Sequence, residues 1–155
     1  MRAGEFIAFA RKLLTLPAAQ CAAGYRSITS RLYYGAYHEA IDFIENDLGF
    51  PHRKTDDNAN KHQYILEYLT GSQVQQAQDL AAQLGQLHQR RKNADYDIAT
   101  ARFDGETFAV ESVVRLDRIA KAIDACREDA VRGKIQAGMT TYRQRRSAQS
   151  PGASS

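Results

Sequence analysis

Apolar residues recur at steps of three and four along most of this chain, which is the period of an amphipathic α-helix. In the longest such stretch, Ile28, Leu32 and Ala36 follow this spacing, with Pro17 before it and Gly49 after it. No alternating pattern typical of a β-strand persists. The pattern predicts five helices, one ending near Pro17 and the others over about 19–47, 58–69, 73–94 and 106–136 or beyond, with polar loops at 50–58 and 95–105.

The length of 155 residues suits one compact domain. Apolar stripes on every predicted helix and short connections between them favour an all-α, up-and-down bundle of four or five helices over residues 1–140. Residues 141–155 are first basic and then rich in Ser, Gly and Pro, which predicts a disordered tail.

The net charge of +3 is mild, but the basic side chains are gathered at 88–92 and 127–146. Basic patches bind phosphate groups, although a run of charge is more often a solvated helix face. If either segment contacts nucleic acid, the candidate residues are Arg90, Lys92, Arg143, Arg145 and Arg146.

Other classes of protein are disfavoured by what the sequence lacks. No hydrophobic run reaches the ~20 residues that span a bilayer, and the first residues lack the layout of a secretory signal, so we expect a cytoplasmic protein with no membrane contact. Cys21 and Cys126 are far apart and are expected to pack as small apolar residues. The four histidines show no metal-binding spacing and no Gly-rich phosphate loop is present, so neither a metal nor a cofactor is predicted.

Two predicted helices carry polar side chains where an apolar stripe should continue. On the helix at 73–94, the steps from Leu84 and Leu87 lead to Arg91 and then to Asp95. The helix at 19–47 carries a polar series spaced by four, with two neighbours beside it: Arg26, Ser30, Tyr34, His38 and Asp42, with Ser27 and Arg31. An unpaired buried charge is costly, so these side chains need partners in a polar seam between the helices.

Two interpretations of this seam are open. In the first it is structural: Arg91 pairs with Asp95 or another acid and orients the Tyr96 loop. In the second it cleaves RNA without a metal, because an imidazole transfers protons near neutral pH and a guanidinium matches a phosphate. The candidate catalytic residues are then Arg91, His38, Asp95, Tyr96 and Arg31.

At Ser30–Ala40 and Arg91–Asp97 the chain resembles the HEPN superfamily of helical-bundle domains. The resemblance is to a subgroup with segments like Ser-Arg-x-Tyr-Tyr-x-Ala-Tyr/Phe-His-x-Ala and Arg-x-x-Ala-Asp-Tyr-Asp. It implies a four- or five-helix bundle, often a homodimer, with a polar groove near the dimer interface. Many members are ribonucleases of toxin–antitoxin and antiphage systems, and many are encoded beside a minimal nucleotidyltransferase antitoxin.

The chain departs from the nuclease members of this family at one residue. Their signature is an arginine followed, after four to six residues, by a histidine. Arg91 matches the arginine, but no histidine follows His88, and Tyr96 and Asp97 occupy the region instead. His38 would then have to supply the imidazole, or Tyr96 would have to contribute.

Three functions therefore remain open: an RNA-cleaving toxin or defence effector, a non-catalytic module that binds a nucleotidyltransferase or nucleic acid, and a structural subunit of a larger complex. Homodimerisation is a separate expectation. Gly35, Ala36 and Ala40 are small, and we expect them to admit a helix of a second copy.

Overall fold

Every regular element in the computed structural model, which describes residues 3–51 and 61–149, is helical. The prediction of an all-α helical bundle is confirmed, and the described residues contain no strand. The α-helices are α1 (Ala3–Thr15), α2 (Ala22–Asp42), α3 (Lys61–Gly71), α4 (Gln75–Tyr96), α5 (Glu106–Arg127) and α6 (Asp129–Gln149). Shorter helical turns are η1 (Pro17–Ala19), the π-helical η2 (Phe43–Asp47) and η4 (Ala101–Phe103).

The chain forms two compact units where its length predicted one domain. Unit 1 comprises Met1–Ile41 with Gln83–Lys121, and unit 2 comprises Asp42–Ala82 with Ala122–Ser155. The division falls within α4 and α5, so each of these helices contributes to both units.

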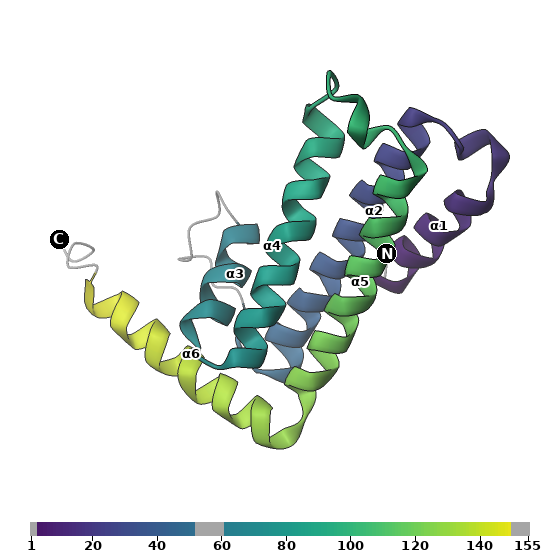
Figure 1. The fold of residues 1–155 in the computed structure, drawn as a ribbon. Helices are drawn as coiled ribbons and strands as arrows, with labels where there is room; N and C mark the ends of the chain where they lie inside the picture. Colours follow the sequence, from purple (N-terminus) through teal and green to yellow (C-terminus); the bar gives the residue numbers. More distant parts are fainter. Residues whose placement is uncertain (1–2, 52–60, 150–155) are drawn as a thin grey trace. The chain divides into compact units, whose positions relative to one another are not determined.

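Unit 1 is built from α1, α2, the second part of α4 and the first part of α5 (Figure 1). Thr29 and Ser112 join α2 to α5 inside the core, with their hydroxyl oxygens 3.3 Å apart. At the surface, Arg11 of α1 forms an ion pair of 2.5 Å with Asp117 of α5. The apolar stripes predicted from the sequence supply the buried side chains, which include Ile28, Leu32, Leu84, Leu87 and Leu116.

The small residues of α2 are used inside unit 1. Gly35, Ala36 and Ala40 are buried, and a Cβ atom at Gly35 would lie 2.5 Å from Cγ1 of Ile7 on α1. The missing side chain therefore lets α1 approach α2 closely. The prediction that these residues admit a helix of a second copy is wrong, because elements of the same chain bury them. Homodimerisation itself stays a prediction.

In unit 2, α6 packs on α3 through aromatic and arginine side chains. The rings of Tyr68 and Tyr142 meet edge to face, with centroids 5.3 Å apart. Nε of Arg143 donates a hydrogen bond of 3.2 Å to the Tyr68 hydroxyl, and the same guanidinium lies 4.7 Å from the ring centre of Phe50. Gly49 has a φ of +71°, which confirms the predicted glycine cap after the second helix.

The end of α4 lies later than the sequence predicted. The sequence predicts Asp95 and Tyr96 in a loop, but α4 continues through Tyr96. Arg91 and Asp95 form an ion pair one turn apart, and the Arg26 guanidinium binds the carbonyl oxygens at this helix end. A cation at a helix C-terminus satisfies carbonyls that have no partner within the helix, so the last turn is stabilised by α2.

The predicted fifth helix is two helices that meet at Glu128 (Figure 1). Arg127 in the last turn of α5 and Asp129 in the first turn of α6 match the preferred charges at helix ends, and this charge pattern is the sequence signal for the break between the two helices.

The tail and one loop predicted from the sequence differ from the structure or lie outside it. Residues 141–149 belong to α6, so the disordered tail predicted there is wrong. Residues 150–155 lie outside the described residues, as does most of the loop predicted at 50–58. The three- and four-residue steps of the predicted fifth helix place Val110 and Ala130 on its inward face, but both are exposed.

Two glycines of α6 are expected to respond in opposite ways to alanine. A Cβ at Gly138 would lie 2.1 Å from the backbone oxygen of Ser72, whereas a Cβ at Gly133 would meet nothing within 4 Å. We expect Gly138→Ala to lower the free energy of unfolding by about 1–3 kcal/mol through overpacking. Gly133→Ala is expected to raise it by ~0.5–1 kcal/mol, because alanine is the better helix former. Urea titrations followed by far-UV circular dichroism measure both values, and equal responses would contradict the packing of α6.

Candidate functional site

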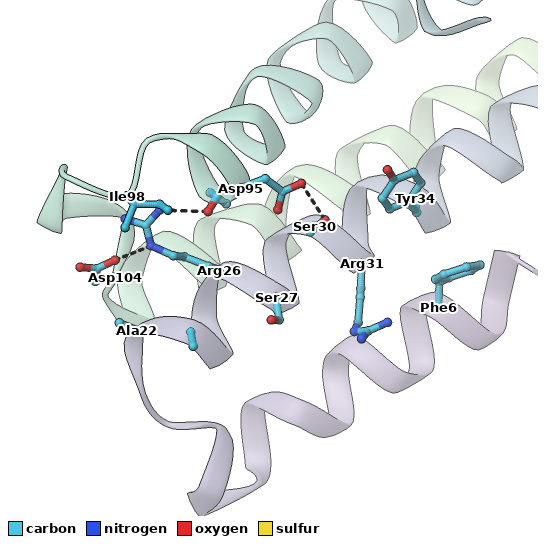
Figure 2. Close-up of a pocket in the computed structure, with 12 residues that line it drawn as sticks. Phe6, Ala22, Arg26, Ser27, Ser30, Arg31, Tyr34, Asp95, Ile98 and Asp104 are labelled. Carbon is cyan, nitrogen blue, oxygen red and sulfur yellow. Dashed lines mark hydrogen bonds and ion pairs between the residues drawn. The ribbon is translucent and has the colours of Figure 1, made fainter.

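A pocket of about 790 Å³ opens on unit 1 between α1, α2 and the end of α4 (Figure 2). Phe6 of α1, Ala94 and Asp95 of α4, and Ile98 and Asp104 beyond α4 form part of its lining. The α2 side is supplied by residues of the polar series predicted from the sequence: Arg26, Ser27, Ser30, Arg31 and Tyr34.

Arg26 fixes the segment that follows α4. Its Nε lies 2.5 Å from Oδ1 of Asp104, and its guanidinium also donates to the backbone oxygens of Ala94 (2.9 Å), Asp97 (3.0 Å) and Thr100 (3.2 Å). Figure 2 shows Arg26 reaching from α2 to Asp104 beside Ile98. Because its donors serve the protein itself, Arg26 holds the pocket in shape and is not free to bind a ligand.

Arg91 lies at the centre of a second network in the same unit. Its Nε is 2.6 Å from Oδ2 of Asp95, close enough for an ion pair but not aligned for a hydrogen bond. Its Nη2 donates a hydrogen bond of 3.0 Å to the Tyr34 hydroxyl, and Ser30 donates one of 3.3 Å to Asp95. Burial lowers the pKa of Arg91, but Asp95, Tyr34 and Tyr96 together raise that pKa above its usual value.

The outer side of α2 presents a third group of polar side chains. Ser27, Arg31, Tyr34 and His38 are spaced by four, three and four residues, so they share one face of the helix. Arg31 is exposed and its guanidinium lies 4.9 Å from the ring centre of Phe9 on α1. His38 is also exposed. We call Ser27, Arg31, Tyr34 and His38 the α2 face.

His38 is joined to the pocket through Phe6. The rings of His38 and Phe6 stack with centroids 5.6 Å apart, and Phe6 also contacts Tyr34 at 6.4 Å. Phe6 and Tyr34 both line the pocket, whereas His38 lies one turn beyond Tyr34. The imidazole therefore lies next to the pocket and not inside it.

Of the five predicted catalytic residues, the structure brings three together directly. Arg91 pairs with Asp95, and its guanidinium lies 5.3 Å from the ring centre of Tyr96, whose side chain is 70% exposed. Arg31 and His38 lie on the α2 face, and in the part of the chain that the structure describes no hydrogen bond or ion pair links either of them to Arg91. Their catalytic roles stay predictions.

The predicted nucleic-acid contacts fall in both units. In unit 1, Lys92 is exposed, but Arg90 is part-buried and engaged with α5: it donates to Ser112 (3.0 Å) and to the Phe108 carbonyl (2.7 Å), and burial lowers its pKa. In unit 2, Arg145 is exposed, whereas two of its neighbours are engaged within the chain. These are Arg143, held by Tyr68, and Arg146, paired with Glu67 at 2.5 Å.

Sequence reasoning missed the pairing of Arg26 with Asp104. Arg26 stands in the polar series on α2, which is a signal that it has a partner. Asp104 lies in an irregular segment before α5, where no helical period places a side chain. The pair is separated by 78 residues, so only the folded chain reveals it.

Three further observations concern metals, thiols and membranes. Within residues 3–51 and 61–149, no group of three or more His, Cys, Asp and Glu side chains is placed to hold a metal ion. Both cysteines are free, Cys21 exposed and Cys126 buried, and burial raises the pKa of the Cys126 thiol to about 11. None of the helices in the described part of the chain combines the length and apolar character needed to cross a bilayer.

Comparison with protein-family models, with curated proteins and with solved structures finds no match to this chain.

Proposed function

We propose that this chain is a HEPN-type protein that binds and cleaves single-stranded RNA, as the toxin or effector of a toxin–antitoxin or antiphage system. The observation that carries the proposal is the α2 face. It offers an exposed cation, Arg31, and an exposed imidazole, His38, on one side of a single helix and beside an open pocket. The two residues are seven apart, which is about 10 Å along the helix axis.

The proposed reaction uses the RNA's own 2′-hydroxyl. His38 accepts the proton of that hydroxyl, the 2′-oxygen attacks the adjacent phosphorus, and the bond from phosphorus to the 5′-oxygen breaks. The leaving 5′-oxygen takes up a proton, which gives a 2′,3′-cyclic phosphate and a free 5′-hydroxyl. Arg31 binds a phosphate of the same strand, and Arg91 and Asp95 position Tyr34 and Ser30 at the pocket wall.

The test is cleavage of labelled single-stranded RNA by the purified protein, with and without a chelator. Cleavage that persists with chelator and leaves cyclic phosphate ends supports the proposal. Intact RNA at protein concentrations that saturate binding would contradict the cleavage step.

Arg31→Ala is expected to weaken RNA binding without affecting folding. Arg31 is exposed, and its contact with Phe9 is its one described interaction. Removing one phosphate contact reduces the slope of log binding constant against log salt by about 0.7–1. Fluorescence anisotropy over a salt series measures this slope. Arg118→Ala, another exposed arginine of unit 1, is the matched control and is expected to leave the slope unchanged.

A second candidate function is a non-catalytic HEPN module, and the state of Arg91 favours it. Its guanidinium is paired with Asp95, bonded to Tyr34 and stacked against Tyr96, so the arginine matched to the nuclease signature is already engaged. Such a module would bind a minimal nucleotidyltransferase, and it would do so as a homodimer or a monomer. Co-purification with the product of a neighbouring nucleotidyltransferase gene, together with no cleavage of any RNA, would favour this function.

A further inference from the structure

The pocket of unit 1 has the size and walls of a site for a flat, ring-shaped group. Its volume of about 790 Å³ lies within the ~300–1,000 Å³ typical of ligand sites. Phe6 and Tyr34 contribute aromatic rings, Ile98 an aliphatic side chain, and three alanines the remaining apolar surface. Unpaired nucleobases stack on walls of this kind.

Asp95, one of the polar side chains that line the pocket, supplies a hydrogen-bond acceptor. Ser30 donates to Oδ2 of Asp95, and Nε of Arg91 lies nearest the same oxygen. Both contacts use Oδ2, so Oδ1 of Asp95 keeps its capacity to accept a hydrogen bond, and Figure 2 shows Asp95 facing Ser30 among the side chains that line the pocket. An ionised carboxylate accepts hydrogen bonds and donates none, so Asp95 selects a ligand with an N–H or amino group.

The charges that line the pocket leave one cation uncompensated. Arg26 is neutralised by Asp104, and Asp95 is neutralised by Arg91. Among the described residues no carboxylate pairs with Arg31. An anionic group is therefore favoured at the Arg31 side of the pocket, next to the site for the ring.

From these three features we infer that the pocket holds one unpaired RNA base that bears an exocyclic amino group, with the adjoining phosphate on Arg31. Asp95 accepts the hydrogen bond from the amino group. Cytosine, adenine and guanine satisfy this requirement, whereas uracil flanks its one N–H with two carbonyl oxygens that repel a carboxylate. This inference rests on the proposed function and names the part of the RNA that is recognised.

The test uses short 2′-O-methyl oligouridines, which cannot be cleaved through the 2′-hydroxyl, with cytidine, uridine or an abasic residue at the centre. We expect the central cytidine to bind about tenfold more tightly than uridine, as measured by fluorescence anisotropy. Equal binding of all three oligonucleotides would overturn the base pocket while leaving RNA binding intact. If none of the three oligonucleotides binds, the proposed function is overturned as well. If cytidine 5′-monophosphate binds and the oligonucleotides do not, the ligand is a free nucleotide and the inference is overturned.

Two variants, Asp95→Asn and Ala23→Trp, test whether the pocket recognises the base, and each has a matched control. Asp95→Asn replaces the acceptor with a side chain that also donates to a carbonyl, so the preference for cytidine is expected to disappear or to reverse toward uridine. Asp117→Asn, at a surface ion pair on α5, is the matched control and should keep the tenfold preference. A preference for cytidine that survives Asp95→Asn would overturn the role of this carboxylate.

The second variant fills the pocket without touching the Arg91 network. Ala23 is exposed and lines the pocket, so Ala23→Trp is tolerated by the fold and occupies the space of the base. Binding of the cytidine oligonucleotide is expected to fall to the level of the abasic one. Ala8→Trp, at an exposed position of α1 outside the pocket, should leave binding unchanged. Undiminished binding by Ala23→Trp would overturn the inference.

Discussion

Replacing Arg26 with methionine is expected to lower the free energy of unfolding by about 3 kcal/mol. The Arg26 side chain is only 12% exposed and that of Asp104 is 33% exposed. The substitution leaves Asp104 without its cation and leaves the carbonyls of Ala94, Asp97 and Thr100 without this donor. We take the lower end of the range for broken buried pairs, because water still reaches Asp104.

Urea titration followed by far-UV circular dichroism measures this effect, since the chain has no tryptophan to report by fluorescence. Arg31→Met is the matched control on the same helix. Its side chain is exposed, so a change within about 0.5 kcal/mol is expected. The double variant Arg26→Met, Asp104→Leu should recover part of the loss, because no unpaired carboxylate remains. An Arg26→Met protein as stable as the parent would contradict the role of Arg26 in holding the end of α4.

Replacing His38 with alanine is expected to reduce RNA cleavage by about 100- to 10,000-fold, the usual contribution of a general acid–base group. His38 is exposed and its described contacts are the rings of Phe6 and Tyr37, so folding should be nearly unaffected. The measurement is the single-turnover cleavage rate together with the melting temperature of the same preparation.

Arg91→Ala is compared with His38→Ala to distinguish a loss of cleavage caused by lost stability from one caused by lost chemistry. That variant leaves Asp95 part-buried without its cation and removes the donor to Tyr34, so cleavage and melting temperature should fall together. A loss of cleavage in His38→Ala without a loss of stability supports a chemical role for the imidazole. Cleavage by His38→Ala at the parent rate would contradict that role and favour the non-catalytic module.

Interactions between residues close together in the sequence made much of the fold predictable. Leu84 and Leu87 are buried because a helix repeats its inward face every three or four residues, whatever lies opposite. Gly49 adopts a positive φ because a side chain is strained there. In the structural interpretation of the polar seam, Arg91 pairs with Asp95 or another acid. The structure confirms the ion pair between Arg91 and Asp95, since residues four apart are neighbours on any helix.

Predictions failed where the outcome depended on a distant partner. The last turn of α4 persists because Arg26, far away in sequence, binds its carbonyl oxygens. The sequence also does not show that Arg90 and Arg143, in two basic runs, are each part-buried against a neighbouring helix. A charge pattern shows which side chains are polar but not which of them another helix covers.

The sequence by itself determined that this chain is helical, where most of its core residues lie and that α2 and α4 carry polar side chains on faces expected to be apolar. Only the tertiary structure decided that Gly35 admits α1 of the same chain, that Arg26 pairs with Asp104, and that Arg31 and His38 remain at the surface beside a pocket. The physical reason is the distance along the chain over which each interaction acts. Helical period and backbone preference act within a turn or two, whereas burial, ion pairing and pocket shape are set by residues brought together from distant parts of the chain.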